Sequence, residues 1–153
     1  MKKVLAGVII VMFVFVFFNI NVNAQSSAIG TWKTVASEGP DKGKAQSHIE
    51  IFEQSGVYTG KIVKLLLKPQ DTLCDKCKGD FKDKPIVGMV NLQNMKKTGS
   101  TDEELGEAYE GGTVMNPDDG KTYKCKFWVK GDVLTLRGYI AFVYKTQVWS
   151  RVK

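Results

Sequence analysis

The chain has 153 residues, with 22 lysines and arginines against 16 aspartates and glutamates, and a net charge of +6. The basic residues are interspersed with acidic ones and form no dense stripe, which argues against a nucleic-acid-binding protein. A chain of this length has room for one domain with one hydrophobic core.

The N-terminus has the pattern of a secretory signal peptide. Two lysines precede an apolar run over residues 4–18, and small residues up to Ala24 fit a cleavage site. A membrane anchor is the alternative, but a spanning helix needs about 20 apolar residues, and three asparagines follow the run at once. We therefore predict a signal peptide over 1–24 and an exported domain over 25–153, periplasmic or extracellular, with no membrane span after cleavage.

The predicted exported domain carries 20 basic and 16 acidic residues, a net charge of +4. Glycines and short polar clusters interrupt it at the spacing typical of a sandwich or barrel. Tight turns with Gly or Asx residues are predicted at 54–56, 118–120 and 131–132. Between such signals the sequence predicts strands over residues 30–35, 47–53, 57–66, 86–90, 109–115, 121–130, 133–140 and 143–152.

Alternation within these segments indicates strands with one apolar face. In 121–130 the residues Tyr123, Cys125, Phe127 and Val129 point one way, while Trp128 and three lysines point the other. Residues 101–105 could form one short turn, and no long amphipathic helix is predicted. Half-solvated strands joined by hairpins favour an antiparallel meander. Since closure removes exposed edges, we predict an all-β fold of about eight strands closed into a small barrel.

The two ends of the domain carry matching signals. The letters IGTW at 29–32 open the first predicted strand, and VWSRVK at 148–153 ends the last. A Gly-x-Trp start with an arginine near the C-terminus resembles the calycin (lipocalin-like) superfamily. That resemblance implies a structural role for Gly30, Trp32 and Arg151, in which the arginine lies over the tryptophan ring and plugs the closed end of the barrel.

A more specific resemblance comes from four motifs in order: CDKCKGDFKDKPIVGM, EGGTVMNPDDGKTYKC, LRGYI and TQVWSRVK. Together they resemble an exported bacterial family, domain-of-unknown-function family 2147, over 29–153. The resemblance implies a small lipocalin-like barrel in the bacterial envelope with no established reaction. Two departures concern the shape of any pocket: Tyr109 stands where tryptophan is expected, and the stretch between 140 and 146 is short.

The cysteines of the CxxC motif, Cys74 and Cys77, allow three interpretations. A thioredoxin-like redox pair belongs in a βαβ setting, and a structural zinc ion needs four ligands, whereas only Cys125 and His48 could be added here. A disulfide is the usual state of exported thiols. Loop entropy favours a Cys77–Cys125 bridge, which would stabilise the fold by about 4 kcal/mol against about 2 kcal/mol for a Cys74–Cys77 bridge. The position of Cys125 on an apolar strand face instead suits a free, buried thiol.

The Cys74–Cys77 pair belongs to the motif of the resembling family, so the resemblance implies that these two cysteines form the bridge and that Cys125 is free. With one histidine and no nucleophile motif, the sequence predicts no catalytic residue, no metal and no cofactor. Small barrels either fill with side chains or hold one ligand.

The leading hypothesis is an exported, non-enzymatic barrel that binds a small apolar or amphiphilic molecule at a mouth lined by Trp128, Arg137, Tyr139 and Tyr144. The first alternative is a filled barrel that contacts an envelope protein partner through the lysine-rich loop 68–84. The second is a thiol-redox or metal protein that uses the CxxC pair.

Overall fold

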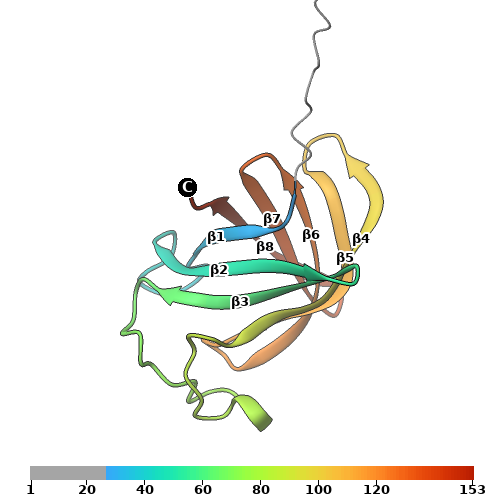
Figure 1. Ribbon diagram of the computed structural model, residues 1–153. Coiled ribbons are helices and arrows are strands. Elements are labelled where there is room, and N and C mark those ends of the chain that lie inside the picture. The colour runs from blue at the N-terminus through green and yellow to red at the C-terminus, as the bar shows by residue number, and fades with distance from the viewer. Residues whose placement is uncertain (1–26) are drawn as a thin grey trace, which may run out of the picture.

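The computed structural model describes residues 27–153 and shows a closed barrel of eight antiparallel strands (Figure 1). Each strand pairs with the next in sequence, and β8 pairs with β1, Arg151 lying opposite Trp32. The predicted all-β, lipocalin-like meander is therefore confirmed. The strands are β1 (Gly30–Val35), β2 (Ala45–Gln54), β3 (Val57–Leu65), β4 (Val90–Asp102), β5 (Gly106–Asn116), β6 (Lys121–Lys130), β7 (Val133–Ile140) and β8 (Val143–Arg151).

One predicted strand is wrong. Residues 86–89 form a turn, in which Met89 N–H donates to the Ile86 carbonyl at 3.2 Å and Gly88 has φ +92°. The strand begins only at Val90 and continues to Asp102, through residues that are mostly exposed after Met95. Because that half of β4 has no buried face, apolar alternation could not reveal it. Residues 103–105 are the β4–β5 turn, where the Asp102 carboxylate accepts the Glu104 and Leu105 N–H groups, both at 2.9 Å.

The antiparallel order places the connections β2–β3, β4–β5 and β6–β7 at one end of the barrel and the other four at the opposite end. The first end is filled. Tyr109 is buried, stacked on Phe127 at 4.6 Å and edge-on to Tyr58 at 4.9 Å between ring centroids. Tyr109 donates its hydroxyl to Glu107 at 2.9 Å. The tyrosine found in place of the expected tryptophan is therefore part of the core at the filled end.

Arg151 plugs this end, as the superfamily resemblance implies. Its guanidinium lies 4.2 Å from the centroid of the fully buried Trp32 ring. Its two terminal nitrogens donate to the carbonyls of Ile29 at 2.9 Å and Ser27 at 2.6 Å. Gly30 has φ +130°, and a Cβ there would come within 2.7 Å of Arg151 Nη1. Glycine at this position thus leaves space for the arginine.

The 66–89 connection between β3 and β4, with the short 3-10 helix η1 (Gly79–Phe81), extends from the open end (Figure 1). The Cys74–Cys77 disulfide lies in it, with an S–S distance of 1.98 Å and both residues buried. Cys77 Sγ is 3.8 Å from Met115 Sδ on β5. Cys125 is free and buried. The disulfide therefore closes a tight turn within the loop, and this turn packs against β5 of the barrel wall.

We expect thiol chemistry to reflect this arrangement. Burial raises the pKa of Cys125 to about 12, so its thiol should resist iodoacetamide in the folded protein and become the single labelled cysteine in the unfolded, unreduced protein. Peptide mapping by mass spectrometry locates the label. Changing Cys74 and Cys77 together to serine should lower the free energy of unfolding by about 2 kcal/mol. Three labelled thiols without reductant would contradict the disulfide.

Among residues 27–153, no helix is both long and apolar enough to cross a bilayer. The predicted signal peptide over 1–24 lies outside the described residues.

Candidate functional site

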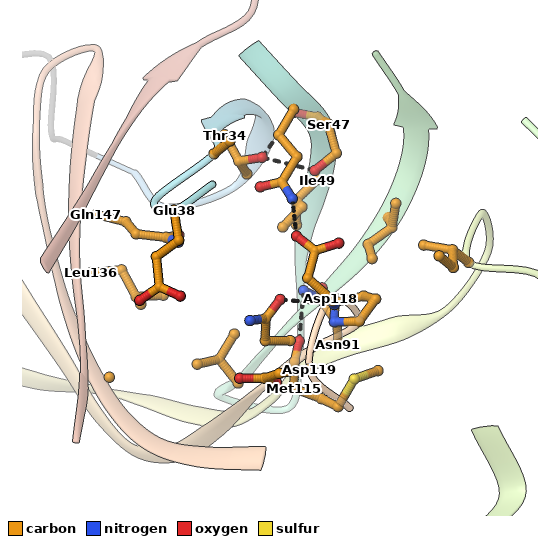
Figure 2. A pocket seen from close by; sticks show the side chains of 18 of the residues that line it. Thr34, Glu38, Ser47, Ile49, Asn91, Met115, Asp118, Asp119, Leu136 and Gln147 are labelled. Carbon is orange, nitrogen blue, oxygen red and sulfur yellow. Dashed lines mark hydrogen bonds between the residues drawn. The ribbon is translucent and has the colours of Figure 1, made fainter. Parts of the chain in front are cut away.

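A cavity of about 300 Å³ enters the open end of the barrel between the loops that end β1, β3, β5 and β7 (Figure 2). Its wall is formed by the inward residues of the strands, which alternate with solvent-facing ones and include both apolar and polar side chains. Tyr109, Phe127 and Trp32, which fill the closed end, are not among its lining residues. The barrel is thus half filled and half hollow. The apolar lining comes mainly from Ile49, Ile62, Leu65, Ile86, Val114, Met115, Leu136 and Trp149.

A small number of polar side chains interrupt this wall. Thr34 and Ser47 face each other across β1 and β2, with 2.8 Å between their hydroxyl oxygens (Figure 2). Asn91, which is 5% exposed, donates from Nδ2 to the Met115 carbonyl at 3.4 Å. Its Oδ1 atom is buried and has no hydrogen-bond partner within the described part of the chain. Asn91 therefore lines the cavity and carries a buried acceptor that has no partner among the described residues.

Charged residues surround the mouth. Asp118, in the β5–β6 turn, accepts from Gln46 Nε2 at 2.5 Å and pairs with Lys68 Nζ at 2.7 Å. Lys145 on β8 pairs with Glu38 in the β1–β2 loop. All four ionic side chains are between 43% and 68% exposed, so each pair contributes little stability. Charged side chains thus surround the mouth, whereas the wall below it carries apolar side chains with Thr34, Ser47 and Asn91 among them.

A phenol also reaches this rim. Tyr123 donates its hydroxyl to the Asp119 carboxylate at 2.5 Å, and this hydrogen bond, followed by desolvation, raises the pKa of Tyr123 to about 12. Tyr123 remains a neutral donor at physiological pH and fixes the β5–β6 turn beside the mouth.

The structure brings the predicted ligand-binding residues together, but on the outer face of the barrel. The Arg137 guanidinium lies between two rings, 5.0 Å from the Trp128 centroid and 4.8 Å from that of Tyr144. Tyr139 packs beside Tyr144 at 5.9 Å. Leu136 and Gly138 line the cavity from the alternate positions of β7, so Arg137 and Tyr139 point outward. The prediction that these four residues line the mouth of the barrel is therefore wrong, because they lie on its outer face. Their role in binding a ligand stays a prediction.

Tyr139 also lines a second, more open pocket of about 530 Å³ beside the 66–89 connection, together with Phe81, Tyr123 and Ile140. His48 lies on the outer face of β2, beside Lys33 and Lys64 in the neighbouring strands. Partial burial, followed by repulsion from these two lysines, lowers the pKa of His48. His48 is therefore separate from the cavity and carries no feature of an acid–base group acting there.

Sequence reasoning missed the polar residues of the cavity. Ser47 lies in phase with Ile49 and Ile51, and Thr34 in phase with Trp32. The alternation alone could have identified both as inward polar side chains. Asn91 had no such signal, because the start of β4 was placed incorrectly and its pairing with β3 shifts register at Gly60.

Comparison with known proteins agrees with this architecture. Residues 30–151 match the family model described as an uncharacterized protein conserved in bacteria, DUF2147. A search of curated proteins finds no match. The solved structure of protein HP1028 from the human pathogen Helicobacter pylori, described as belonging to the lipocalin family, is similar with a TM-score of 0.69, 21% identity and 84% of each chain covered. Because the family model spans the whole barrel, this chain belongs to the DUF2147 family and has a lipocalin-like fold.

Proposed function

We propose that the protein is an exported, non-enzymatic carrier or sensor that binds one small amphiphilic molecule in the cavity at the open end of the barrel. The observation that carries this proposal is a cavity with apolar side chains along its wall and a buried acceptor without a partner, Asn91 Oδ1, in a residue of that wall. Such a combination of apolar walls with few polar groups is typical of small-molecule sites.

The dimensions support a small ligand. A volume of about 300 Å³ is at the lower end of the usual range for ligand cavities. Burying the apolar part of a ligand against Ile49, Leu136 and Trp149 would supply most of the affinity. A hydroxyl, amine or amide N–H group on the ligand would donate to Asn91 Oδ1 once this side chain turns toward the cavity. A charged or strongly polar end of the ligand would remain at the mouth.

The test uses Gly138, which lines the cavity from β7. A Cβ added at Gly138 would lie 3.7 Å from its nearest neighbour, Tyr123 Cβ, which is ordinary van der Waals contact. Gly138→Leu should therefore fill the cavity without disturbing the strand. We expect the fluorescent probe 1-aminoanthracene to bind the native protein saturably, and its affinity to fall at least tenfold in Gly138→Leu.

The matched control is Thr146→Leu, which adds a leucine to the exposed outer face of β8 and should leave the probe affinity unchanged. Asn91→Leu should weaken 1-aminoanthracene, whose amine can donate to Asn91, more than anthracene, which has no donor. Equal probe binding by native protein and Gly138→Leu would refute the cavity as the binding site. Absence of saturable binding to the probe and to a panel of fatty alcohols would favour the envelope interaction protein that uses loop 68–84.

A further inference from the structure

The β7–β8 hairpin presents an apolar tip at the open end of the barrel. Phe142 is fully exposed, Val143 is 64% exposed and Ile140 is 43% exposed. Ile140 and Val143 pair with each other, so these side chains are contiguous. Exposed apolar groups gathered in this way usually mark an interaction site.

The turn itself is unusual in composition. The two-residue turns at the closed end, Ser55-Gly56 and Gly131-Asp132, have the polar and glycine residues that hairpins favour. Ala141-Phe142 has neither, although Ala141 adopts φ +51°, a conformation that favours Gly, Asn or Asp. Local folding energetics therefore do not explain the apolar residues at this tip.

Side chains behind the tip become progressively more polar. Tyr139 and Tyr144 form a cross-strand pair one step from Ile140 and Val143, with their rings 5.9 Å apart. Exposed Lys145 lies opposite Gly138 one step further from the tip, and Arg137 lies opposite Lys126 of β6 one step beyond that. An apolar tip, then tyrosines, then lysines is the order in which side chains meet the acyl chains, the interface and the phosphates of a bilayer.

We infer that the tip formed by Ile140, Phe142 and Val143 inserts into a lipid bilayer, with Tyr139 and Tyr144 at the headgroup level. A bilayer suits this convex shape better than a protein does. A stable protein interface buries about 800 Å² on each partner, whereas a wholly exposed Phe and its two neighbours offer only a few hundred. A bilayer needs no complementary surface.

This docking also brings a source of amphiphiles to the cavity. Ile140 and Lys145 belong both to the hairpin and to the cavity lining, so an inserted tip places the mouth beside the lipid surface. This step rests on the proposed function, because it adds the bilayer as the place where the ligand enters or leaves. Insertion of the tip is itself independent of ligand binding.

The experiment uses protein purified as the cell exports it and vesicles of phosphatidylethanolamine and phosphatidylglycerol that contain nitroxide-labelled acyl chains. Phe142→Trp places a fluorophore at the tip, and Val133→Trp places one at the opposite end of the same hairpin. We expect the tip tryptophan to shift to the blue and to be quenched by the nitroxides, while the tryptophan at 133 is not. Because the native chain has three tryptophans, the emission and quenching of each variant are read as the difference from the native protein under the same conditions. This difference reports on the introduced tryptophan even if another segment of the chain also contacts lipid.

The second measurement is vesicle flotation of Phe142→Ser and Val143→Ser against the control Val133→Ser. Each tip change should lower vesicle affinity by about tenfold, and the control should leave it unchanged. 1-Aminoanthracene binding without vesicles should be unaffected in both tip variants. If the native protein does not bind the probe although its tip inserts into vesicles, the proposed function is refuted and the docking inference stands.

The opposite pattern, a functional cavity with no quenching at 142, would overturn the docking inference alone. A lipid-free dimer that Phe142→Ser converts to a monomer would also overturn it and would identify the tip as a contact between two copies of this chain.

Discussion

Replacing Trp32 by alanine is expected to lower the free energy of unfolding by about 3–5 kcal/mol, as for other large core side chains. The indole is fully buried and donates from Nε1 to the Ala28 carbonyl at 2.8 Å. Its loss would leave a cavity beneath Arg151, whose guanidinium now lies 4.2 Å from the ring. Chemical denaturation followed by far-ultraviolet circular dichroism measures the change.

Trp128→Ala is the matched control. Trp128 is nearly as buried, but it is covered on the outer face by the flexible side chains of Lys126 and Arg137. These chains can close over the space, so we expect a smaller loss of stability than at Trp32. Equal losses would show that the closed-end plug has no special role. Binding of the cavity probe should survive in both variants, because neither tryptophan lines the cavity.

The second large effect is expected at Gly106, the first residue of β5. Its φ is +91°, and a Cβ there would come within 2.1 Å of the Val129 carbonyl oxygen on β6. Gly106→Ala must therefore push two paired strands apart in addition to straining the backbone. Overpacking of this kind costs about 1–3 kcal/mol, on top of about 1–2 for the left-handed conformation.

Gly111 separates the two contributions. It lies on the same strand with φ +87°, but a Cβ there meets nothing within 4 Å. Gly111→Ala should therefore show only the backbone cost of about 1–2 kcal/mol, and the difference between the two variants isolates the collision with Val129. Identical midpoints and slopes for both variants in urea denaturation would mean that the strands adjust without cost.

By itself, the sequence determined the fold class and most strands. The turn signals at 118–120 and 131–132, with alternation in 121–130, predicted the bounds of β6 and the start of β7, because one face of β6 is buried and the other is wet. The motifs at the two ends identified Trp32 and Arg151, which do meet. The polar half of β4 left no such pattern, and so its extent could not be predicted.

The tertiary structure alone decided where the barrel is hollow. Alternation already places Phe127 and Trp128 on opposite faces of β6, but only closure of the sheet shows that Tyr109 and Phe127 fill one end of the barrel. The cavity depends on pairing between distant segments, which joins Thr34, Ser47 and Asn91 around one space. Its unused acceptor, Asn91 Oδ1, is a property of the neighbours of Asn91 in space, and local sequence carries no information about them.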